Sequence, residues 1–393
     1  MSLRRAKILT NKSMKVLFVL EHFHPFVGGV AILFEELAKE LTKQGCQIEV
    51  VTTWLPGLAR DEVWNGIAIH RVKTPPFSRR YWFTILAIPA TWKRARKADI
   101  IQTTTYNAAL PAWVVAKIAQ KPIVITVHEV WGRRWLTYPG NKMLNWIYYL
   151  IEKMIVRLPY TQLLTDSQAT AADLVSVRKN KLHIDVAYPG IDYHLFDSKL
   201  ITKDKARSEV GLDDNFWFIS YGRPGISKGI EYLVEAMVEL KVLDPKARLL
   251  LILNEDPKDR YLIIKQLITR HKLEQSVRLI KPVSREKLPI NIVAADCVIV
   301  PSLAEGFGFT AAEACAMGQP LITTTAGSLP EVAWGRVNFA KPGDTADLVK
   351  VMRLALAHKY GLVKTKHFTW QMTGQKYLNI YQQVLGAGSH ENS

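Results

Sequence analysis

The chain has 393 residues, which at about 100–200 residues per domain predicts two domains. Hydrophobic residues make up 48% and charged residues 22%, which is typical of a globular protein. The three cysteines are scattered and form no CxxC pair, so a disulfide framework or a zinc site is not expected and a reducing compartment is favoured. The net charge of +17 lies mostly in residues 1–188, which carry 26 Lys and Arg against 13 Asp and Glu.

The chain shows no signal peptide and no membrane span. Residues 1–13 are basic but no apolar signal region follows them, and because a clean apolar run starts at Met14 we expect them to be a tail or an upstream start. The apolar stretch 81–92 is too short to cross a bilayer, and the stretch 143–158 is interrupted by charged residues.

The first half alternates strands with helices. The run 15–20 is continuously apolar, as in a strand buried on both faces of a parallel sheet. A loop with Gly28 and Gly29 follows, and apolar residues then recur at helical spacing over 30–41, with Gly45 as the stop. Further strands are expected at 47–53, 99–104, 122–128 and 162–167.

A domain joint is expected at 187–196, where Pro189 and Gly190 separate two such blocks. The pattern then restarts with a strand at 216–222, a loop up to residue 229 and a helix at 230–240. Further strands are expected at 247–253, 277–283, 297–302 and 320–325, and a last helix at 370–385 precedes a polar tail.

Two glycine-containing loops are candidates for binding phosphate. Gly28 and Gly29 stand between a strand and a helix, where free N–H groups favour anions, although a tight turn would explain them equally well. No GxGxxG is present, so a nicotinamide fingerprint is not supported. In the loop that starts at Gly222, Arg223 and Lys228 suit a diphosphate, and the alternative is a pair of solvated cations.

The stretch 305–314, EGFGFTAAEA, contains two carboxylates eight positions apart. Glu305 stands after a predicted strand, where ligands bind in open α/β sheets. Glu313 follows Thr310 by three residues, which matches a capping box, so it either contacts a ligand or only caps the helix.

Four segments together resemble the retaining, nucleotide-sugar-dependent glycosyltransferases of the GT-B family 4 type, also called group 1. They are HPFVGGV, AYPGIDYHLF, YGRPGISKGIEYLVEA and the stretch from EGFGF to SLPEV with its two glutamates separated by seven residues. The resemblance covers about residues 14–385 and implies an α/β protein of two Rossmann-like parallel-sheet domains that face a cleft. It implies an acceptor-binding domain at 14–188, a nucleotide-sugar-binding domain at 189–370, and a C-terminal helix within 371–393 that packs back on the first domain.

The resemblance also implies roles for single residues. Arg223 and Lys228 would hold the donor diphosphate, Glu305 would lie near the donor sugar, and Glu313 would accept hydrogen bonds from the ribose. His128 sits where the family often has a histidine near the transferred sugar, although a histidine satisfied at a strand end would look the same. The implied donor-binding residues are Gly28, Gly29, Gly222, Gly306, Phe307, Gly308, Phe309, Thr310 and Glu313.

The chemistry of the leaving group suggests how such a site works. Breaking a glycosyl–diphosphate bond places negative charge on the phosphate, so fixed cations and helix N–H groups are the main catalytic tools. The family implies front-face displacement with retention of configuration. No DxD-like motif stands in a suitable context, so we expect no metal and no cofactor besides the donor substrate.

The chain departs from the family pattern at three places. Gly327-Ser328 replaces Gly-Gly, Asn254 stands where a glycine is common, and Lys281-Pro282 replaces another glycine. The second and third departures border the expected base pocket, so they put the identity of the base in doubt more than nucleotide binding.

The basic first half suggests an anionic membrane surface. Residues 63–98 contain no Asp or Glu but eight Lys and Arg, and eight of the eleven tryptophans precede residue 189. A solvated helix face with core tryptophans is the alternative. No nucleic-acid-binding module is present, so nucleic acid is not expected as a partner. The candidates for membrane or acceptor contact are Arg79, Arg80, Trp82, Lys93, Arg94, Arg133, Arg134 and Trp135.

The sequence therefore predicts a hexosyltransferase that uses a UDP- or GDP-sugar and a lipid-linked acceptor, peripheral on the cytoplasmic face of the membrane. The alternatives are an epimerase or hydrolase of the same fold and a non-catalytic membrane scaffold that binds sugar nucleotides. Arg223, Lys228, Glu305 and Glu313, present together, argue against the scaffold. The sequence does not identify the base, the sugar, the acceptor or the oligomeric state.

Overall fold

The computed structural model describes residues 13–138, 140–178 and 183–387, and these form two compact units. Among the described residues, the first unit comprises 13–138, 140–166, 170–178, 183–190 and 370–387, and the second comprises 167–169 and 191–369. The chain therefore passes to the second unit after Gly190 and returns at Trp370. Of the tail expected at residues 1–13, all but Ser13 lies outside the described residues.

The described part of the first unit contains an eight-stranded sheet in the order β3-β4-β2-β1-β5-β6-β7-β8. All neighbours are parallel except β3 and β4. The strands are β1 (Lys15–Val19), β2 (Gln47–Thr53), β3 (Asp61–Trp64), β4 (Ile67–Val72), β5 (Ile100–Thr104), β6 (Ile123–Val127), β7 (Gln162–Thr165) and β8 (Ile184–Val186).

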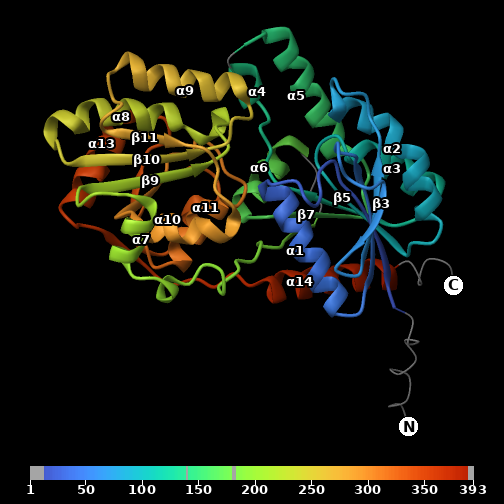
Figure 1. Cartoon of the computed structure of the whole chain (residues 1–393). Coiled ribbons are helices and arrows are strands. Elements are labelled where there is room, and N and C mark those ends of the chain that lie inside the picture. Colours follow the sequence, from blue (N-terminus) through green and yellow to red (C-terminus); the bar gives the residue numbers. More distant parts are fainter. Residues whose placement is uncertain (1–12, 139, 179–182, 388–393) are drawn as a thin grey trace. The chain divides into compact units, whose positions relative to one another are not determined.

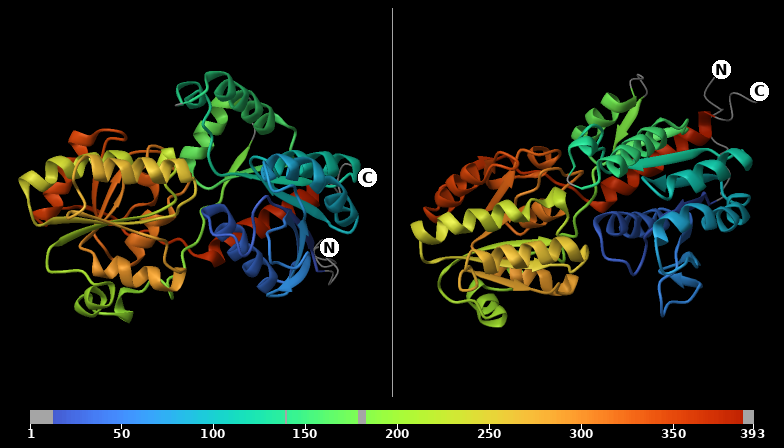
Figure 2. Two further views of the ribbon diagram at one scale, coloured as in Figure 1. Left: turned by 45° about the horizontal axis from the view of Figure 1, so that its top comes forward. Right: turned by 90° about the horizontal axis from the view of Figure 1, so that it is seen from above.

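The helices of this unit cover both faces of its sheet. One core joins the sheet to side chains of α2, α3, α5 and α6. The C-terminal helix α14 runs beside α1, as the red and dark blue helices of Figure 2 show. The helices are α1 (Gly29–Lys43), α2 (Arg79–Ala95), α3 (Ala109–Ile118), α4 (Arg134–Thr137), α5 (Lys142–Arg157), α6 (Gln168–Arg178) and α14 (Trp370–Ala387).

Helix α14 belongs to the first unit because its tyrosines fill that unit's interior. Tyr377 and Tyr381 are fully buried, and their hydroxyls lie 2.8 Å from Thr126 Oγ1 and 2.9 Å from Gln102 Oε1. Gly374 lets the helix approach α1, since a Cβ there would lie 2.5 Å from Cγ of Glu40.

The described part of the second unit contains a seven-stranded sheet in the order β11-β10-β9-β12-β13-β14-β15, with only β15 antiparallel to its neighbour. Helices α8, α9 and α13 cover one face and α7, α10 and α11 the other (Figure 1). The strands are β9 (Phe216–Gly222), β10 (Ala247–Leu253), β11 (Val277–Ile280), β12 (Cys297–Val300), β13 (Leu321–Thr324), β14 (Gly335–Ala340) and β15 (Gly361–Val363). The helices are α7 (Lys203–Val210), α8 (Ile230–Leu243), α9 (Lys258–Arg270), α10 (Leu288–Ala294), α11 (Phe309–Ala316), α12 (Leu329–Val332) and α13 (Thr345–Leu356).

The order of strands in each sheet predicts at which edge of the sheet a ligand binds. Strand order reverses between β1 and β5 in the first sheet and between β9 and β12 in the second. Ligands of open α/β sheets bind beyond the carboxyl ends of the strands at such a reversal. The loop of Gly28 follows β1, the loop of Arg223 and Lys228 follows β9, and Glu305 follows β12.

The predicted pair of parallel-sheet α/β units is confirmed, and the buried apolar runs explain the success. Val16 to Val19, for example, are all at most 1% exposed, as expected of a strand covered on both faces. No helix among the described residues has the length and apolarity needed to cross a membrane.

Candidate active site

Two loops of the second unit are joined at the strand-order reversal between β9 and β12. A Cβ on Gly229 would lie 2.2 Å from the carbonyl oxygen of Pro301, so only glycine allows this approach. The carbonyl of Ser227 accepts a hydrogen bond from the Leu303 N–H at 2.6 Å. The loop 222–229 is thereby fixed beside the segment that leads to Glu305.

Lys228 and Glu305 form an ion pair at this junction. The Lys228 ammonium lies 2.8 and 2.7 Å from the two carboxylate oxygens of Glu305. The Glu305 side chain is only 12% exposed and that of Lys228 is 38% exposed. The structure thus brings together two predicted site residues that are 77 positions apart. A carboxylate in this position orients the ammonium toward the junction of the two loops.

Arg223 lies at the outer end of the same loop and has a weak partner. Its guanidinium pairs with Asp256 at 3.1 Å, and both side chains are exposed. An exposed pair of this kind contributes little to stability, so the guanidinium can turn to a phosphate at small cost. Gly222 adopts φ 131°, which favours glycine, and its carbonyl accepts a hydrogen bond from Asn254 N–H at 3.1 Å.

The loop from Glu305 to Gly308 is held from behind by Ser328. The Ser328 hydroxyl donates to the Phe307 carbonyl at 2.7 Å, and its N–H donates to the Glu305 carbonyl at 3.2 Å. Gly308 has φ 92°, a left-handed value that favours glycine, and is the residue before α11. The departure from Gly-Gly at this point therefore supplies a hydroxyl that fixes the loop.

The capping box, the alternative use considered for Glu313 with Thr310, is wrong. Helix α11 starts at Phe309 after Gly308, so Thr310 already lies within the first turn. Glu313 is instead buried, and its carboxylate accepts a hydrogen bond from the Tyr221 hydroxyl at 3.1 Å. A cap lies just outside the helix, and α11 starts two residues earlier than a Thr310 cap requires, which removes that geometry.

Burial sets the electrostatics of Glu313. Desolvation raises its pKa to about 7, against smaller opposite effects of Arg285 and of the Tyr221 hydrogen bond. Burial, and then the charge of Glu313, raise the pKa of Tyr221 well above its usual value, so the phenol stays a donor. Tyr221 was not singled out in the sequence. Its place near the end of β9, beside the loop of Arg223, is the signal that was available.

The glycine loop of the first unit ends at the start of α1. Gly28 is the residue before the helix, its backbone is extended, and no side chain caps the helix. Extended backbone does not require glycine. A Cβ on Gly28 would lie 3.1 Å from the ring of Phe26, so the space above the helix start is restricted. Gly29 opens the helix.

His128 directly follows β6 and is held by a carboxylate from the neighbouring strand. Its Nδ1 lies 2.5 Å from Oδ2 of Asp166, which follows β7. Phe34 packs edge-on against the imidazole ring. The other ring nitrogen, Nε2, is buried and has no hydrogen-bond partner among the described residues. Asp166 was missed in the sequence, although adjacent parallel strands bring their carboxyl ends together.

The membrane candidates at the ends of α2 differ in their surroundings. Lys93 and Arg80 are exposed, with Arg80 3.9 Å from Glu21. Arg94 instead pairs with Asp61 at 3.6 Å, and burial lowers its pKa. Trp82 and Arg79 are half-buried.

The second group of candidates lies in a loop organised by a buried carboxylate. Glu152 of α5 accepts hydrogen bonds from the N–H groups of Trp131 and Gly132, at 3.0 and 2.6 Å. It also accepts from the Trp135 indole at 3.0 Å and the Tyr106 hydroxyl at 2.8 Å. Glu152 therefore orders this segment and accepts the hydrogen bond of the Trp135 indole. The sequence indicated it only as an interruption of an apolar stretch.

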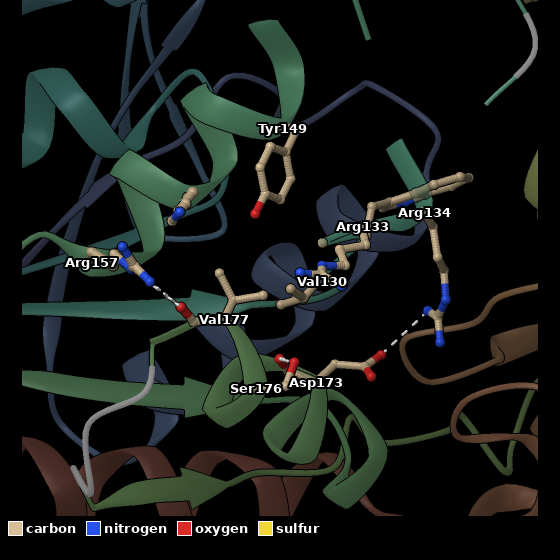
Figure 3. Close-up of a pocket in the computed structure, with 11 residues that line it drawn as sticks. Val130, Arg133, Arg134, Tyr149, Arg157, Asp173, Ser176 and Val177 are labelled. Atoms are coloured by element: carbon tan, nitrogen blue, oxygen red, sulfur yellow. Dashed lines mark hydrogen bonds and ion pairs between the residues drawn. The ribbon is translucent and has the colours of Figure 1, made fainter. Parts of the chain in front are cut away.

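Arg133 and Arg134 of this loop line a pocket of about 520 Å³ within the first unit (Figure 3). Helices α5 and α6 supply its other walls. It is lined by Val130, Trp131, Gly132, Arg133, Arg134, Tyr149, Lys153, Arg157, Asp173, Ser176 and Val177.

Comparisons with known proteins cover both units. The sequence profile of Glycosyltransferase Family 4 matches residues 27–195, and that of Glycosyl transferases group 1 matches residues 202–370. The chain is 29% identical over 342 residues to an uncharacterized glycosyltransferase of Methanocaldococcus jannaschii, spanning 83% of this chain and 84% of that relative.

Two solved structures share the fold. Sucrose-phosphate synthase from Thermosynechococcus elongatus superposes with a TM-score of 0.80 at 21% identity, covering 96% of this chain and all of that one (100%). HepE of Anabaena, in complex with UDP and glucose, superposes with a TM-score of 0.75 at 19% identity, covering 93% and 99%.

Proposed function

The chain belongs to the family 4 type of the GT-B glycosyltransferases, and from this premise we propose that it transfers a hexose from a UDP- or GDP-sugar to an acceptor with retention of configuration. The observation that carries the proposal is the junction after β9 and β12. There two joined loops and the helix α11 that follows them carry an ammonium, a guanidinium and two carboxylates.

Lys228 and Arg223 suit the leaving diphosphate. As the glycosyl–oxygen bond breaks, negative charge grows on the phosphate, and cations fixed in advance stabilise that charge more than they stabilise the bound donor. Glu305 holds Lys228 through both of its carboxylate oxygens. A diphosphate that approaches Lys228 meets an ammonium that is already oriented, and the Glu305 carboxylate is left to accept hydrogen bonds from sugar hydroxyls.

Glu313 and Tyr221 suit the nucleoside. The buried carboxylate of Glu313, on α11 beside the end of β9, is a hydrogen-bond acceptor for the two hydroxyls of a ribose, and Tyr221 orients it. HepE, which shares the fold, was solved with UDP and glucose. The residues that border the expected base pocket are joined here by an ion pair of 3.5 Å between Lys281 and Glu255.

His128 of the first unit suits the reacting sugar. Its free, buried Nε2 is a donor or acceptor for a hydroxyl, and Asp166 fixes the ring. In the proposed front-face displacement, the C1–oxygen bond to the diphosphate breaks while C1 bonds to the acceptor oxygen on the same face. The acceptor proton passes to the departing phosphate oxygen, so atoms and charge balance without a metal.

A lipid-linked acceptor at the cytoplasmic membrane face is the second part of the proposal. It is supported by the +13 charge of residues 1–188 and by the exposed cations at both ends of α2, including Arg80 and Lys93. Clustered cations near an anionic surface contribute about 1 kcal/mol each to binding.

Thermal shift with UDP-, GDP-, ADP- and TDP-sugars tests the donor, and product analysis with and without membrane lipid extract tests transfer. We expect one nucleotide series to stabilise the protein and sugar to appear on lipid at a rate that EDTA does not lower. Equal turnover without acceptor would indicate a hydrolase or epimerase. Donor binding with no turnover under any condition would indicate a non-catalytic protein.

A further inference from the structure

Helix α5 presents three different faces. One face packs into the first unit through Asn145, Glu152, Ile155 and Val156. A second is apolar and exposed, with Met143 at 70% and Trp146 at 53% of their full exposure. The exposed apolar residues of α5 are Met143, Leu144, Trp146, Ile147, Leu150, Ile151 and Met154. A contiguous apolar patch of this kind marks a site of interaction.

The third face lines the pocket. Tyr149, Lys153 and Arg157 follow one another at four-residue spacing, which places them on one side of a helix. Arg133 and Arg134 line the same pocket from the segment before α5, and Figure 3 shows the Arg134 side chain directed toward Asp173. Four cations therefore meet one carboxylate, Asp173, among the lining residues.

The cations of the pocket are only partly engaged. Arg134 pairs with Asp173 at 3.3 Å, and Arg157 donates to the Val177 carbonyl at 2.8 Å (Figure 3). The Lys153 ammonium lies over the Tyr149 ring at 5.6 Å. The pocket keeps a positive charge that phosphate oxygens would neutralise.

On α5 the positively charged side chains that line the pocket lie next to the exposed apolar face. Its one acidic residue, Glu152, is turned inward and holds four donors, so the outer faces carry only positive charge. A soluble anion would use the pocket but not the apolar face. An amphipathic helix of 16 residues, about 24 Å long, can lie in a lipid interface with its apolar face inserted.

We propose that this pocket binds the phosphate of an anionic membrane lipid whose acyl chains lie along the exposed apolar face of α5. Helix α5, rather than α2 alone, then lies in the membrane interface. The inference rests on the proposed membrane role but not on the transfer reaction, and it names the partner as a lipid phosphate.

Vesicle binding by the full chain tests the pocket. The variants Lys153→Gln and Arg133→Gln should each lower the partition coefficient onto phosphatidate-containing vesicles about fivefold. Lys350→Gln, an exposed cation on α13 of the second unit, has the same charge change and should lower it less than twofold. Equal losses in all three variants would mean that only the net charge matters, and the pocket would be refuted.

A fluorescent label tests insertion of the apolar face. The three native cysteines are buried, so Ile147→Cys can be labelled selectively with an environment-sensitive dye. Vesicles should shift its emission to the blue, and lipids brominated on the acyl chains should quench it. A label at Val242→Cys on α8, also an exposed apolar position, should show neither effect. An Ile147 label that stays in water on bound vesicles would overturn the orientation.

Soluble ligands distinguish the source of the phosphate. Inorganic phosphate and glycerol 3-phosphate should bind at least a hundredfold more weakly than vesicles, because they lack the chains. Comparable affinity would assign the pocket to a soluble anion and refute the lipid. Thermal shift by sugar nucleotides should be unchanged in Lys153→Gln, which separates failure here from failure of the proposed transfer.

Discussion

At the scale of single residues, the two glutamates of EGFGFTAAEA differ in their surroundings more than in their chemistry. Glu305 is paired with Lys228, whereas Glu313 is buried against a neutral phenol. The Glu305 carboxylate is therefore the partner of a cation. Burial raises the pKa of Glu313 to about 7, so its carboxyl group is about half protonated at neutral pH. This difference yields separate tests.

Replacement of Glu313 by Gln should stabilise the protein at high pH and weaken donor binding. Below pH 4.5, the ordinary pKa, Glu313 is protonated in both the folded and the unfolded chain. As pH rises to about 7, only the unfolded chain loses the proton readily, so the free energy of unfolding falls by up to about 3 kcal/mol. Glu313→Gln lacks this loss, and its melting temperature should exceed that of the wild type at pH 8 but not at pH 4.

Donor binding should change in the opposite direction to stability, because Glu313→Gln should bind the donor more weakly at high pH. If the ionised carboxylate binds the ribose, the wild-type KM for the donor should fall as pH rises through about 7. In Glu313→Gln the KM should be about tenfold higher at pH 8 and should no longer change with pH. A variant with wild-type KM at all pH values would remove Glu313 from the donor site.

Lys228→Met should lower kcat/KM about 10²–10³-fold, the usual effect of losing one group that stabilises charge in the transition state. It also leaves the Glu305 carboxylate unpaired, so stability should fall. The double variant Lys228→Met with Glu305→Gln should regain stability without regaining activity. Recovery of activity in the double variant would show that the pair is structural only.

At the scale of elements, backbone geometry explains what the loops require. The strand-order reversal between β9 and β12 brings the loops of Lys228 and Glu305 together, and glycines make the approach possible. Gly327 makes as close an approach as Gly229. A Cβ there would lie 2.2 Å from the Glu305 carbonyl oxygen, and its φ is 52°.

Gly327→Ala should therefore displace the Glu305 loop and reduce donor affinity at least tenfold. Gly343→Ala is the matched control, since its φ of 72° carries a similar backbone cost of about 1 kcal/mol, but the nearest atom would lie 3.5 Å away. Calorimetric titration with the donor nucleotide compares the two. Equal losses of affinity would mean that backbone strain, rather than the clash with Glu305, is responsible.

The element scale also shows where local pattern was read incompletely. The antiparallel pair β3–β4 was not predicted, although its turn, Asn65-Gly66, is the commonest signal for a two-residue hairpin. Both turn residues have positive φ. The short strands β8, β14 and β15 were also missed, because none of them has more than two adjacent apolar residues, unlike the buried strands that were predicted.

At the scale of the whole molecule, the last described helix belongs to the unit that contains the first described strand. Helix α14 closes the first unit with two fully buried tyrosines. A chain that ends at Thr369 should lose the first unit's stability, because each buried ring contributes about 3 kcal/mol and the total stability of a domain is only about 5–15 kcal/mol. A chain that ends at Ala387 is the control.

Limited proteolysis and circular dichroism measure this outcome. Rapid cleavage within residues 15–186 of the shorter chain, with a protected second unit, is the expected result. A first unit that stays protected without α14 would mean that the helix is an accessory to the core.

The sequence by itself determined the two α/β units, most of the parallel strands and the loops that carry the site. Continuous apolar runs, helical spacing and glycine positions are local properties, and a chain displays them before it folds. The family followed from motifs whose order along the chain is also visible in the sequence.

Only the tertiary structure decided how the charged residues are used. The pairing of Lys228 with Glu305, the burial of Glu313 beside Tyr221 and the support of His128 by Asp166 join residues 38–92 positions apart. The tertiary structure also decided that Glu152 is buried and that an apolar face of the same helix, α5, is exposed. Burial and partner identity depend on which distant segments meet, and they set the pKa and the availability of each group.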